Sequence, residues 1–380
     1  MVVTIVVLLI LAGISLNLVL GKNGIITKAQ EARDKTEQAR INTEKSINSL
    51  EQELSDYVNK INSGNGGNSG GSQTTVENVV IPEGYYYVGG TKAKGIVISD
   101  NVADKELDKG KENVRRDLAG NQWVWVPVET PSSLYTTVDA GQALAGSTGV
   151  KTTKYTNTII SGQTRGLPGS DSFREPDILT DSGYDDTNYA TAGFSSLANM
   201  AETMVSEYEE MIASLEKYKG FYIGRYELSA NGEKTGATQN KNWYTLYKNC
   251  TTLAVGSKVK TRMIWGLQWD ATCKWLATSN FDITNSSTWG NYSNNTAGGH
   301  GTKQNTGYSE SWKANNIYDF AGNCEELTQE ADGTIVRASR GGFYNDDGPD
   351  RPASSRIYYS PTDTDTYSYF GSRPTLYLIP

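Results

Sequence analysis

The sequence contains a single histidine, His300, among its 380 residues. Non-haem iron sites, most catalytic zinc sites and imidazole-based triads each need histidine, usually more than one. His300 itself lies in a glycine-rich stretch, Gly298 to Gly301, which is typical of a solvated loop. The composition therefore argues against the histidine-dependent classes of catalytic site.

Cysteine is also scarce, with Cys250, Cys273 and Cys324 as the three present. In an extracellular domain, two of them could form one disulfide and leave one thiol over. We favour the alternative, in which all three are buried as small apolar side chains. Oxidation state is therefore left open by the sequence.

Basic residues are fewer than acidic ones: the chain has 35 Lys and Arg and 43 Asp and Glu, which gives a net charge of −8. Binding to duplex nucleic acid needs clustered Lys and Arg that displace counterions. The sequence therefore predicts no nucleic-acid partner.

The first 20 residues, Met1 to Leu20, carry no charge. A helix of this length spans about 30 Å, which matches the hydrocarbon core of a bilayer. No small-residue cleavage site of a secretory signal peptide follows. We expect this segment to insert in a lipid bilayer, in preference to a buried core helix.

A polar helix is predicted from Lys22 to about Ile61, since no Pro or Gly interrupts the chain from Ile25 to Asn62. Apolar residues recur every three to four positions, as at Ile47, Leu50 and Leu54. A coiled coil would show the same spacing. The apolar segment that continues directly into this helix favours an interpretation other than a coiled coil.

An apolar helix continuing into an amphipathic one resembles the first helix of type IV pilins of Gram-positive, clostridia-like bacteria. The resemblance lies in VVTIVVLLILAGISLNLVLGKNGIITKAQEA. It implies that residues 1–62 form a pilin-like transmembrane plus amphipathic helix. Residues 1–20 would then anchor the chain in the membrane or a pilus, with the bulk of the chain outside, at the cell surface.

Residues 63–75 form a Gly/Ser/Asn-rich stretch, SGNGGNSGGSQTT, which predicts a flexible linker. The remainder, residues 76–380, is here called the head. Its apolar patterns predict an α+β domain with helices at 195–219 and 266–278. Strands are expected at 85–88, 123–128, 220–228, 334–338 and 375–378.

Several motifs of the head resemble the formylglycine-generating-enzyme-like branch of the C-type lectin fold. They are VWVPV (124–128), KGFYIGRYELS (219–229), GLQWDATCKWLAT (266–278), NIYDFAGNCEELTQE (316–330), VRASRGGFY (336–344) and the closing GSRP (371–374). The resemblance implies that fold for most of residues 76–380, with an insertion at about 130–194.

The oxidases of that branch bind copper through two cysteines after the Arg-Gly-Gly motif, and the sulfoxide synthases bind iron through three histidines. The corresponding segment here, GFYNDDGPDRPASSRIYY, has no cysteine, and the chain has one histidine. We therefore expect neither copper nor iron and no enzymatic activity. A metal-dependent oxidase with unfamiliar ligands is the less favoured alternative.

Related proteins bind calcium at the Asn-Ile-Tyr-Asp turn, and the resemblance carries this site to Asp319, the carbonyls of Gly322 and Cys324, and Glu326. Oxygen ligands from one tight turn suit Ca²⁺. The alternative is that Asp319 caps a turn and that Glu326 is a solvated or paired strand acid.

The segment from about 340 to 373, here called the variable segment, is rich in Tyr, Asn, Asp, Ser and Thr. Tyrosine offers a large contact area with few torsions, and the small polar residues offer adaptable hydrogen bonds. The segment resembles the variable region of proteins diversified by diversity-generating retroelements. The predicted ligand-binding residues are Tyr344, Asn345, Asp346, Asp347, Asp350, Tyr358, Tyr359, Thr362, Asp363, Thr364, Asp365, Thr366, Tyr367, Ser368 and Tyr369.

The favoured function is therefore a receptor- or adhesin-like protein that binds an unknown protein or glycan at the cell surface. Two alternatives for the variable segment stay open: ligand binding without diversification, and an ordinary polar, Tyr-rich loop of a surface protein. A structural minor pilin or pseudopilin, whose head only decorates a filament, is the alternative from another class.

Overall fold

The computed structural model describes most of the head. The described residues are 74–131, 135–138, 152–155, 173–175, 188–228, 241–295, 301–332, 336–359 and 367–380. The predicted helix at 1–62, nearly all of the linker, His300 and most of the insertion lie outside them. Among the described residues, no helix has both the length and the apolar character needed to cross a membrane.

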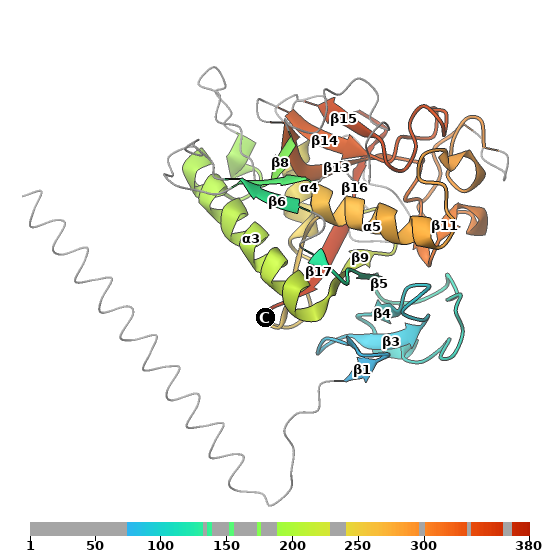
Figure 1. Cartoon of the computed structure of the whole chain (residues 1–380). Helices are drawn as coiled ribbons and strands as arrows, with labels where there is room; N and C mark the ends of the chain where they lie inside the picture. Colours follow the sequence, from blue (N-terminus) through green and yellow to red (C-terminus); the bar gives the residue numbers. More distant parts are fainter. Residues whose placement is uncertain are drawn as a thin grey trace, which may run out of the picture. The chain divides into compact units, whose positions relative to one another are not determined.

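An antiparallel sheet of six strands runs through the lower half of the head in Figure 1. Its order is β10 (Val259–Met263), β17 (Pro374–Leu378), β9 (Gly220–Gly224), β5 (Gln122–Pro127), β4 (Val97–Ser99) and β3 (Tyr86–Gly89). The C-terminal strand β17 lies in its interior, between β10 and β9. The last residues of the chain therefore belong to the centre of the fold.

Side chains along β5 point alternately to the two faces of this sheet, and each face packs in a hydrophobic core. Val124 and Val126 belong to one buried apolar cluster, and Trp123 and Trp125 belong to the other. Successive strand residues point to opposite faces, so this run of four apolar residues contributes to both clusters.

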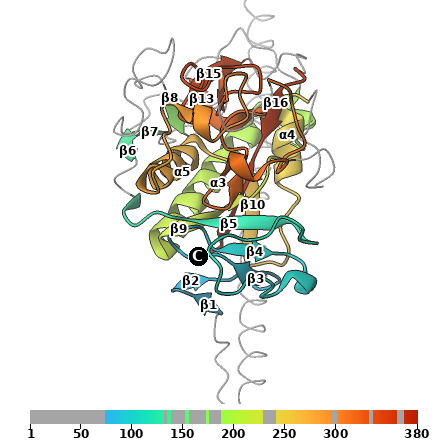
Figure 2. The same cartoon turned by 90° about the vertical axis from the view of Figure 1, so that its right-hand side faces the viewer.

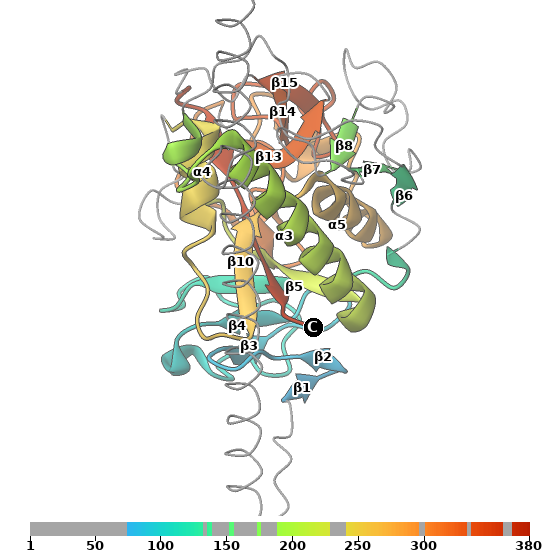
Figure 3. The ribbon, with the colours of Figure 1, turned by 90° about the vertical axis from the view of Figure 1, so that its left-hand side faces the viewer.

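Three helices pack against the sheets (Figure 3). They are α3 (Leu197–Tyr218), α4 (Trp243–Cys250) and α5 (Gly266–Thr278). In α3, the Ser196 side chain accepts from the Asn199 N–H at the start, and Lys219 adopts φ 58° at the end. The two helices predicted in the head, at 195–219 and 266–278, are thus confirmed, whereas α4 was missed.

A second sheet lies near the top of the head in Figure 2. Its described strands are β15 (Arg356–Tyr359), β14 (Val336–Arg340), β13 (Glu325–Asp332), β8 (Phe173–Glu175), β7 (Thr152–Tyr155) and β6 (Tyr135–Val138). Strand β16 (Phe370–Ser372) pairs in parallel with β13. Short pairs are formed by β1 (Thr75–Val76) with β2 (Val79–Val80) and by β11 (Lys313–Ala314) with β12 (Ile317–Tyr318).

The mixture of helices and antiparallel sheets confirms the α+β prediction. One strand boundary was wrong: the predicted strand at 220–228 ends at Gly224. Arg225 then turns inward and donates to the carbonyls of Asn316, Arg115 and Val114. Cys250, Cys273 and Cys324 are free and buried, as the favoured interpretation held.

Candidate ligand-binding surface

The variable segment begins with a tight bend at the end of β14. Gly341 and Gly342 have φ values of 85° and 68°, which glycine adopts without strain. A Cβ atom on Gly342 would lie 2.4 Å from the Arg351 carbonyl oxygen. The Gly-Gly pair therefore lets the chain leave β14 close to the returning strand.

A buried ionic network holds the hairpin of β14 and β15 to the rest of the head. Arg340 donates to Asp270 at 2.7 Å and to Glu330 at 3.0 Å. Arg356 donates to Asp270 at 2.9 Å and also pairs with Glu330. All four side chains are buried. Burial raises the pKa of Glu330, while Arg356 and Arg340 act to lower it.

Arg373 performs the same task at the other end of the segment. It is fully buried, donates to both carboxylate oxygens of Glu326, and also donates to the carbonyls of Gly224, Tyr318 and Asp319. One arginine thereby joins β9, the turn after β12, and β13. The closing Gly-Ser-Arg-Pro motif is therefore structural.

Between these anchors, four aromatic rings contact one another, and we call them the aromatic face. Phe343 stacks on Tyr369 with ring centres 4.4 Å apart, and Tyr369 stacks on Tyr367 at 5.1 Å. Tyr344 meets Phe343 edge to face at 5.3 Å. Tyr367 is 38% exposed and the other three rings are partly exposed. Segments 343–344 and 367–369 therefore meet in one surface.

Two of the polar residues next to the aromatic face, Asp346 and Asp347, accept hydrogen bonds that hold the loop. The Asp346 side chain accepts from the Phe343 N–H at 3.0 Å, and the Asp347 side chain accepts from the Ser293 hydroxyl at 2.7 Å. These two acids therefore shape the loop as well as bordering it. Burial raises the pKa of Asp346. Asn345 and Asp350 are exposed.

The remaining predicted contact residues lie in β15, beside Tyr367, or outside the described residues. Tyr358 and Tyr359 lie in β15, opposite Ala338 and Arg337 of β14, and Ser368 is exposed beside Tyr367. Thr362, Asp363, Thr364, Asp365 and Thr366 lie outside the described residues.

Three residues of this surface were missed from the sequence. Phe343 lies at the centre of the aromatic face, the Lys303 ammonium donates to the Ser368 carbonyl, and Ser293 bonds to the 346–347 loop. Phe343 directly follows Gly341-Gly342 and precedes Tyr344, so its position could have indicated a surface role. Lys303 and Ser293 are distant in sequence and gave no such signal.

Two of the predicted calcium ligands, Asp319 and Glu326, lie near each other, and both have other partners. Both oxygens of Glu326 accept from Arg373, so a divalent ion there would lie beside a guanidinium. One oxygen of Asp319 accepts from the Gly307 N–H at 2.6 Å, and the other is buried without a hydrogen bond. Glu326 is thus a paired strand acid in this arrangement, as the alternative held, while calcium binding by the four predicted ligands stays a prediction.

The pKa values of two neighbouring carboxylates, Asp319 and Glu326, reflect their burial away from water. Burial raises the pKa of Asp319 to about 6 and that of Glu326 to about 7, against the opposing effect of Arg373. No group of three or more His, Cys, Asp or Glu in the described part of the chain is arranged to hold a metal. Such groups consist of side chains alone, and the predicted calcium site uses two carboxylates and two backbone carbonyls. The calcium site therefore stays a prediction.

Comparison with known proteins gives structural neighbours only. No protein-family model and no curated protein matches the chain. Variable protein 1 of Treponema denticola is similar, with 14% identity, 43% of this chain and 85% of that chain covered, and a TM-score of 0.31.

Two further solved structures are similar to the same extent. PvdO of Pseudomonas aeruginosa has 16% identity, covers 42% of this chain and 82% of its own, and has a TM-score of 0.31. CarF has 12% identity, 43% and 88% coverage, and a TM-score of 0.32. The neighbours thus include a variable protein, as the sequence resemblance predicted. Similarities of this extent assign no activity or ligand to this chain.

Proposed function

We propose that this protein binds a protein or glycan ligand through the aromatic face and the polar residues around it. The observation that carries the proposal is the cluster of Phe343, Tyr344, Tyr367 and Tyr369 at the surface of a segment whose ends are held by buried arginines. Aromatic side chains supply large contact areas at low entropic cost.

The scaffold beneath supports this role because it does not depend on the exposed side chains. Arg340, Arg356 and Arg373 find their partners in Asp270, Glu330 and Glu326, none of which belongs to the aromatic face. Exposed positions can therefore change while the strands stay in place. A C-type-lectin-type scaffold diversified by a retroelement would use the segment in this way.

The finer parts of the proposal concern the setting of the binding surface. Residues 1–20 would anchor the chain in a bilayer or pilus, and the Gly/Ser-rich linker would let the head reach a ligand outside the cell. The head would act by contact and not by catalysis, since the residues that hold copper or iron in the related enzymes have no counterpart in its sequence.

Ligand screening of the full chain in lipid nanodiscs tests the binding role. A glycan microarray and a microarray of purified surface proteins are probed with the wild type and with the triple variant Tyr344→Ser, Tyr367→Ser, Tyr369→Ser. Loss of aromatic hot-spot residues typically weakens binding by about tenfold or more per residue, so the triple variant is expected to lose its signals.

Tyr308→Ser is the matched control, because Tyr308 is 55% exposed and lies on a separate turn, where it contacts Trp312. The control is expected to keep every signal of the wild type. Signals that survive in the triple variant, or disappear in the control as well, would show that the binding surface lies elsewhere.

Diversification has its own test in the DNA around the gene. We expect a reverse-transcriptase gene and a near-copy of the 3′ end that differs from this gene at adenines. Differences spread evenly over all four bases would contradict this part of the proposal and leave the binding role intact.

A further inference from the structure

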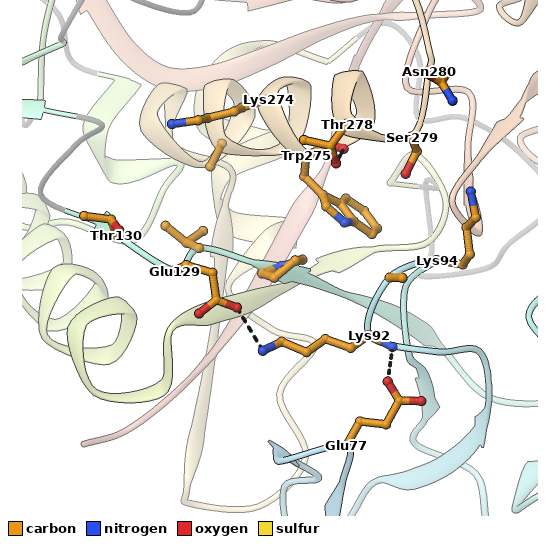
Figure 4. A pocket seen from close by; sticks show the side chains of 14 residues that line it. Glu77, Lys92, Lys94, Glu129, Thr130, Lys274, Trp275, Thr278, Ser279 and Asn280 are labelled. Atoms are coloured by element: carbon orange, nitrogen blue, oxygen red, sulfur yellow. Dashed lines mark hydrogen bonds and ion pairs between the residues drawn. The ribbon is translucent and has the colours of Figure 1, made fainter.

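A separate cavity of 870 Å³ lies in the head, and Figure 4 shows the side chains that line it. Its walls come from the β1–β2 turn, the turn between β3 and β4, the end of β5, and α5. None of its lining residues belongs to the variable segment. Its volume is in the range of about 300–1,000 Å³ found for small-molecule sites.

The charges of the cavity are only partly neutralised by one another. The Lys92 N–H donates to Glu77 at 2.7 Å, and the Lys92 ammonium pairs with Glu129 at 2.9 Å. The Lys92 ammonium therefore neutralises Glu129, whereas Glu77 accepts from a backbone N–H and keeps its negative charge. Lys94 and Lys274 also line the cavity, and neither ammonium has a hydrogen bond or ion pair within the described residues.

The two ammonium groups are separated by an indole. In Figure 4, Trp275 descends from α5 between Lys274, which lies toward Thr130, and Lys94, which lies toward Ser279. Trp275 is a largely buried side chain, 6% exposed. The cavity therefore presents an ammonium group without a partner among the described residues at each end and an aromatic ring between them.

The negative end of the α5 dipole also faces this region, but its carbonyls are already engaged. The N–H groups of Ser279 and Phe281 donate to the Leu276 carbonyl, and the N–H of Asn280 donates to the Ala277 carbonyl. A helix end contributes only about half a unit charge. The ammonium groups of Lys94 and Lys274 together outweigh this helix end and the Glu77 carboxylate.

We propose that this cavity binds an elongated organic anion that carries acidic groups at its two ends and a flat middle part. Lys94 and Lys274 would each pair with one acidic group, and the middle part would lie against Trp275. An acidic sugar of two uronic-acid units and an aromatic dicarboxylate share this chemistry. This site is independent of the ligand proposed for the aromatic face.

Calorimetric titration of the full chain in nanodiscs, with empty nanodiscs as the blank, tests the inference. The probes are naphthalene-2,6-dicarboxylate and digalacturonate, which distinguish the two sources of the anion. Naphthalene-2,6-dicarboxamide and the methyl ester of digalacturonate are their uncharged counterparts. At least one dianion is expected to bind about tenfold or more tightly than its uncharged counterpart, and binding should weaken at high salt.

Substitutions then locate the site. Lys94→Gln with Lys274→Gln is expected to weaken binding by about tenfold or more, since two charged pairs are lost. Ala93→Asp, which adds a carboxylate at an exposed residue of the rim, should also weaken it. Lys248→Gln, an exposed lysine of α4 outside the cavity, is the matched control and should bind as the wild type does.

Absence of binding by both dianions, equal binding of the uncharged counterparts, or binding unaffected by both Lys94→Gln with Lys274→Gln and Ala93→Asp would overturn the proposal. The triple tyrosine variant of the aromatic face should bind the dianion normally. The result at this cavity therefore leaves the proposed function of the aromatic face untouched.

Discussion

Arg340 and Tyr344 are four residues apart in the variable segment, yet their environments are opposite. Arg340 is fully buried and bonded to Asp270 and Glu330, whereas Tyr344 is partly exposed and its ring contacts Phe343. The same division recurs at the end of the segment, where Tyr367 is exposed and Arg373 is buried. Stability and contact chemistry are thus assigned to different residues of one segment.

Breaking the buried network should have the largest effect on stability. Asp270→Asn leaves Arg340 and Arg356 without half of their carboxylate partners, and loss of one member of a buried ion pair costs about 3–5 kcal/mol. Urea unfolding of the full chain measures the change. The control is Glu216→Gln, since Glu216 pairs with Lys219 at the surface and such pairs contribute about 0–1 kcal/mol. Equal effects in both variants would erase the distinction between buried and exposed pairs.

Asp108 is an intermediate case, because its carboxylate is buried while Lys111 and Arg115 are exposed. Burial acts to raise the pKa of Asp108, but Arg115 and Lys111 outweigh it and hold that pKa well below the usual range. The pKa is lower folded than unfolded, where it is about 3.9. Its contribution to stability is therefore present above that pH and is lost as the pH falls below it.

We therefore expect Asp108→Asn to lower the free energy of unfolding by about 1–2 kcal/mol at pH 7. The gap between variant and wild type should narrow at about pH 3, because Asp108 takes up a proton in the unfolded state there while the folded state keeps its charge. Urea titrations at the two pH values provide the measurement. A gap that is unchanged or wider in acid would contradict the assigned pairing.

Removing the rings of the aromatic face should cost less stability per residue than removing either buried carboxylate. Tyr344→Ser, Tyr367→Ser and Tyr369→Ser change partly exposed rings, and surface substitutions usually alter stability by about 0.5 kcal/mol or less each. The triple variant is expected to unfold within about 1.5 kcal/mol of the wild type. A loss as large as that of Asp270→Asn would mean that the rings belong to the scaffold.

Calcium should have no measurable effect if Glu326 stays with Arg373. Thermal unfolding is measured with about 1 mM CaCl₂, a concentration suited to a weak extracellular calcium site, and with EGTA. The two midpoint temperatures should be the same. A clear rise with calcium would restore the predicted site at Asp319, Glu326 and the carbonyls of Gly322 and Cys324.

Sequence patterns predicted the helices and strands whose formation depends on residues close together in the sequence. The helix at 266–278 was located because Trp269, Cys273 and Leu276 recur at helical spacing, and all three are buried in α5. Helix α4 was missed because it is only eight residues long and polar residues are mixed with its aromatic ones. Strand β13 was missed because it is rich in Glu and Gln, whose burial depends on distant arginines.

The site was only partly predictable for the same reason. Repeated Tyr, Asn and Asp marked the variable segment, but nothing in those letters distinguishes Asp347, which accepts from Ser293, from exposed Asn345. The partner of Glu326 is Arg373, 47 residues away along the chain. Such pairings arise from tertiary contacts, which a single sequence does not encode locally.

The separation of scaffold from contact residues is tested most directly by reshuffling. In one variant, Tyr344, Asn345, Asp350, Tyr367 and Ser368 are exchanged among Tyr, Asn, Asp and Ser, and the full chain is examined by urea unfolding and on the ligand microarrays. The account predicts an unfolding free energy within about 1.5 kcal/mol of the wild type and a changed ligand profile. An unfolded variant, or one that keeps the original ligands, would contradict it.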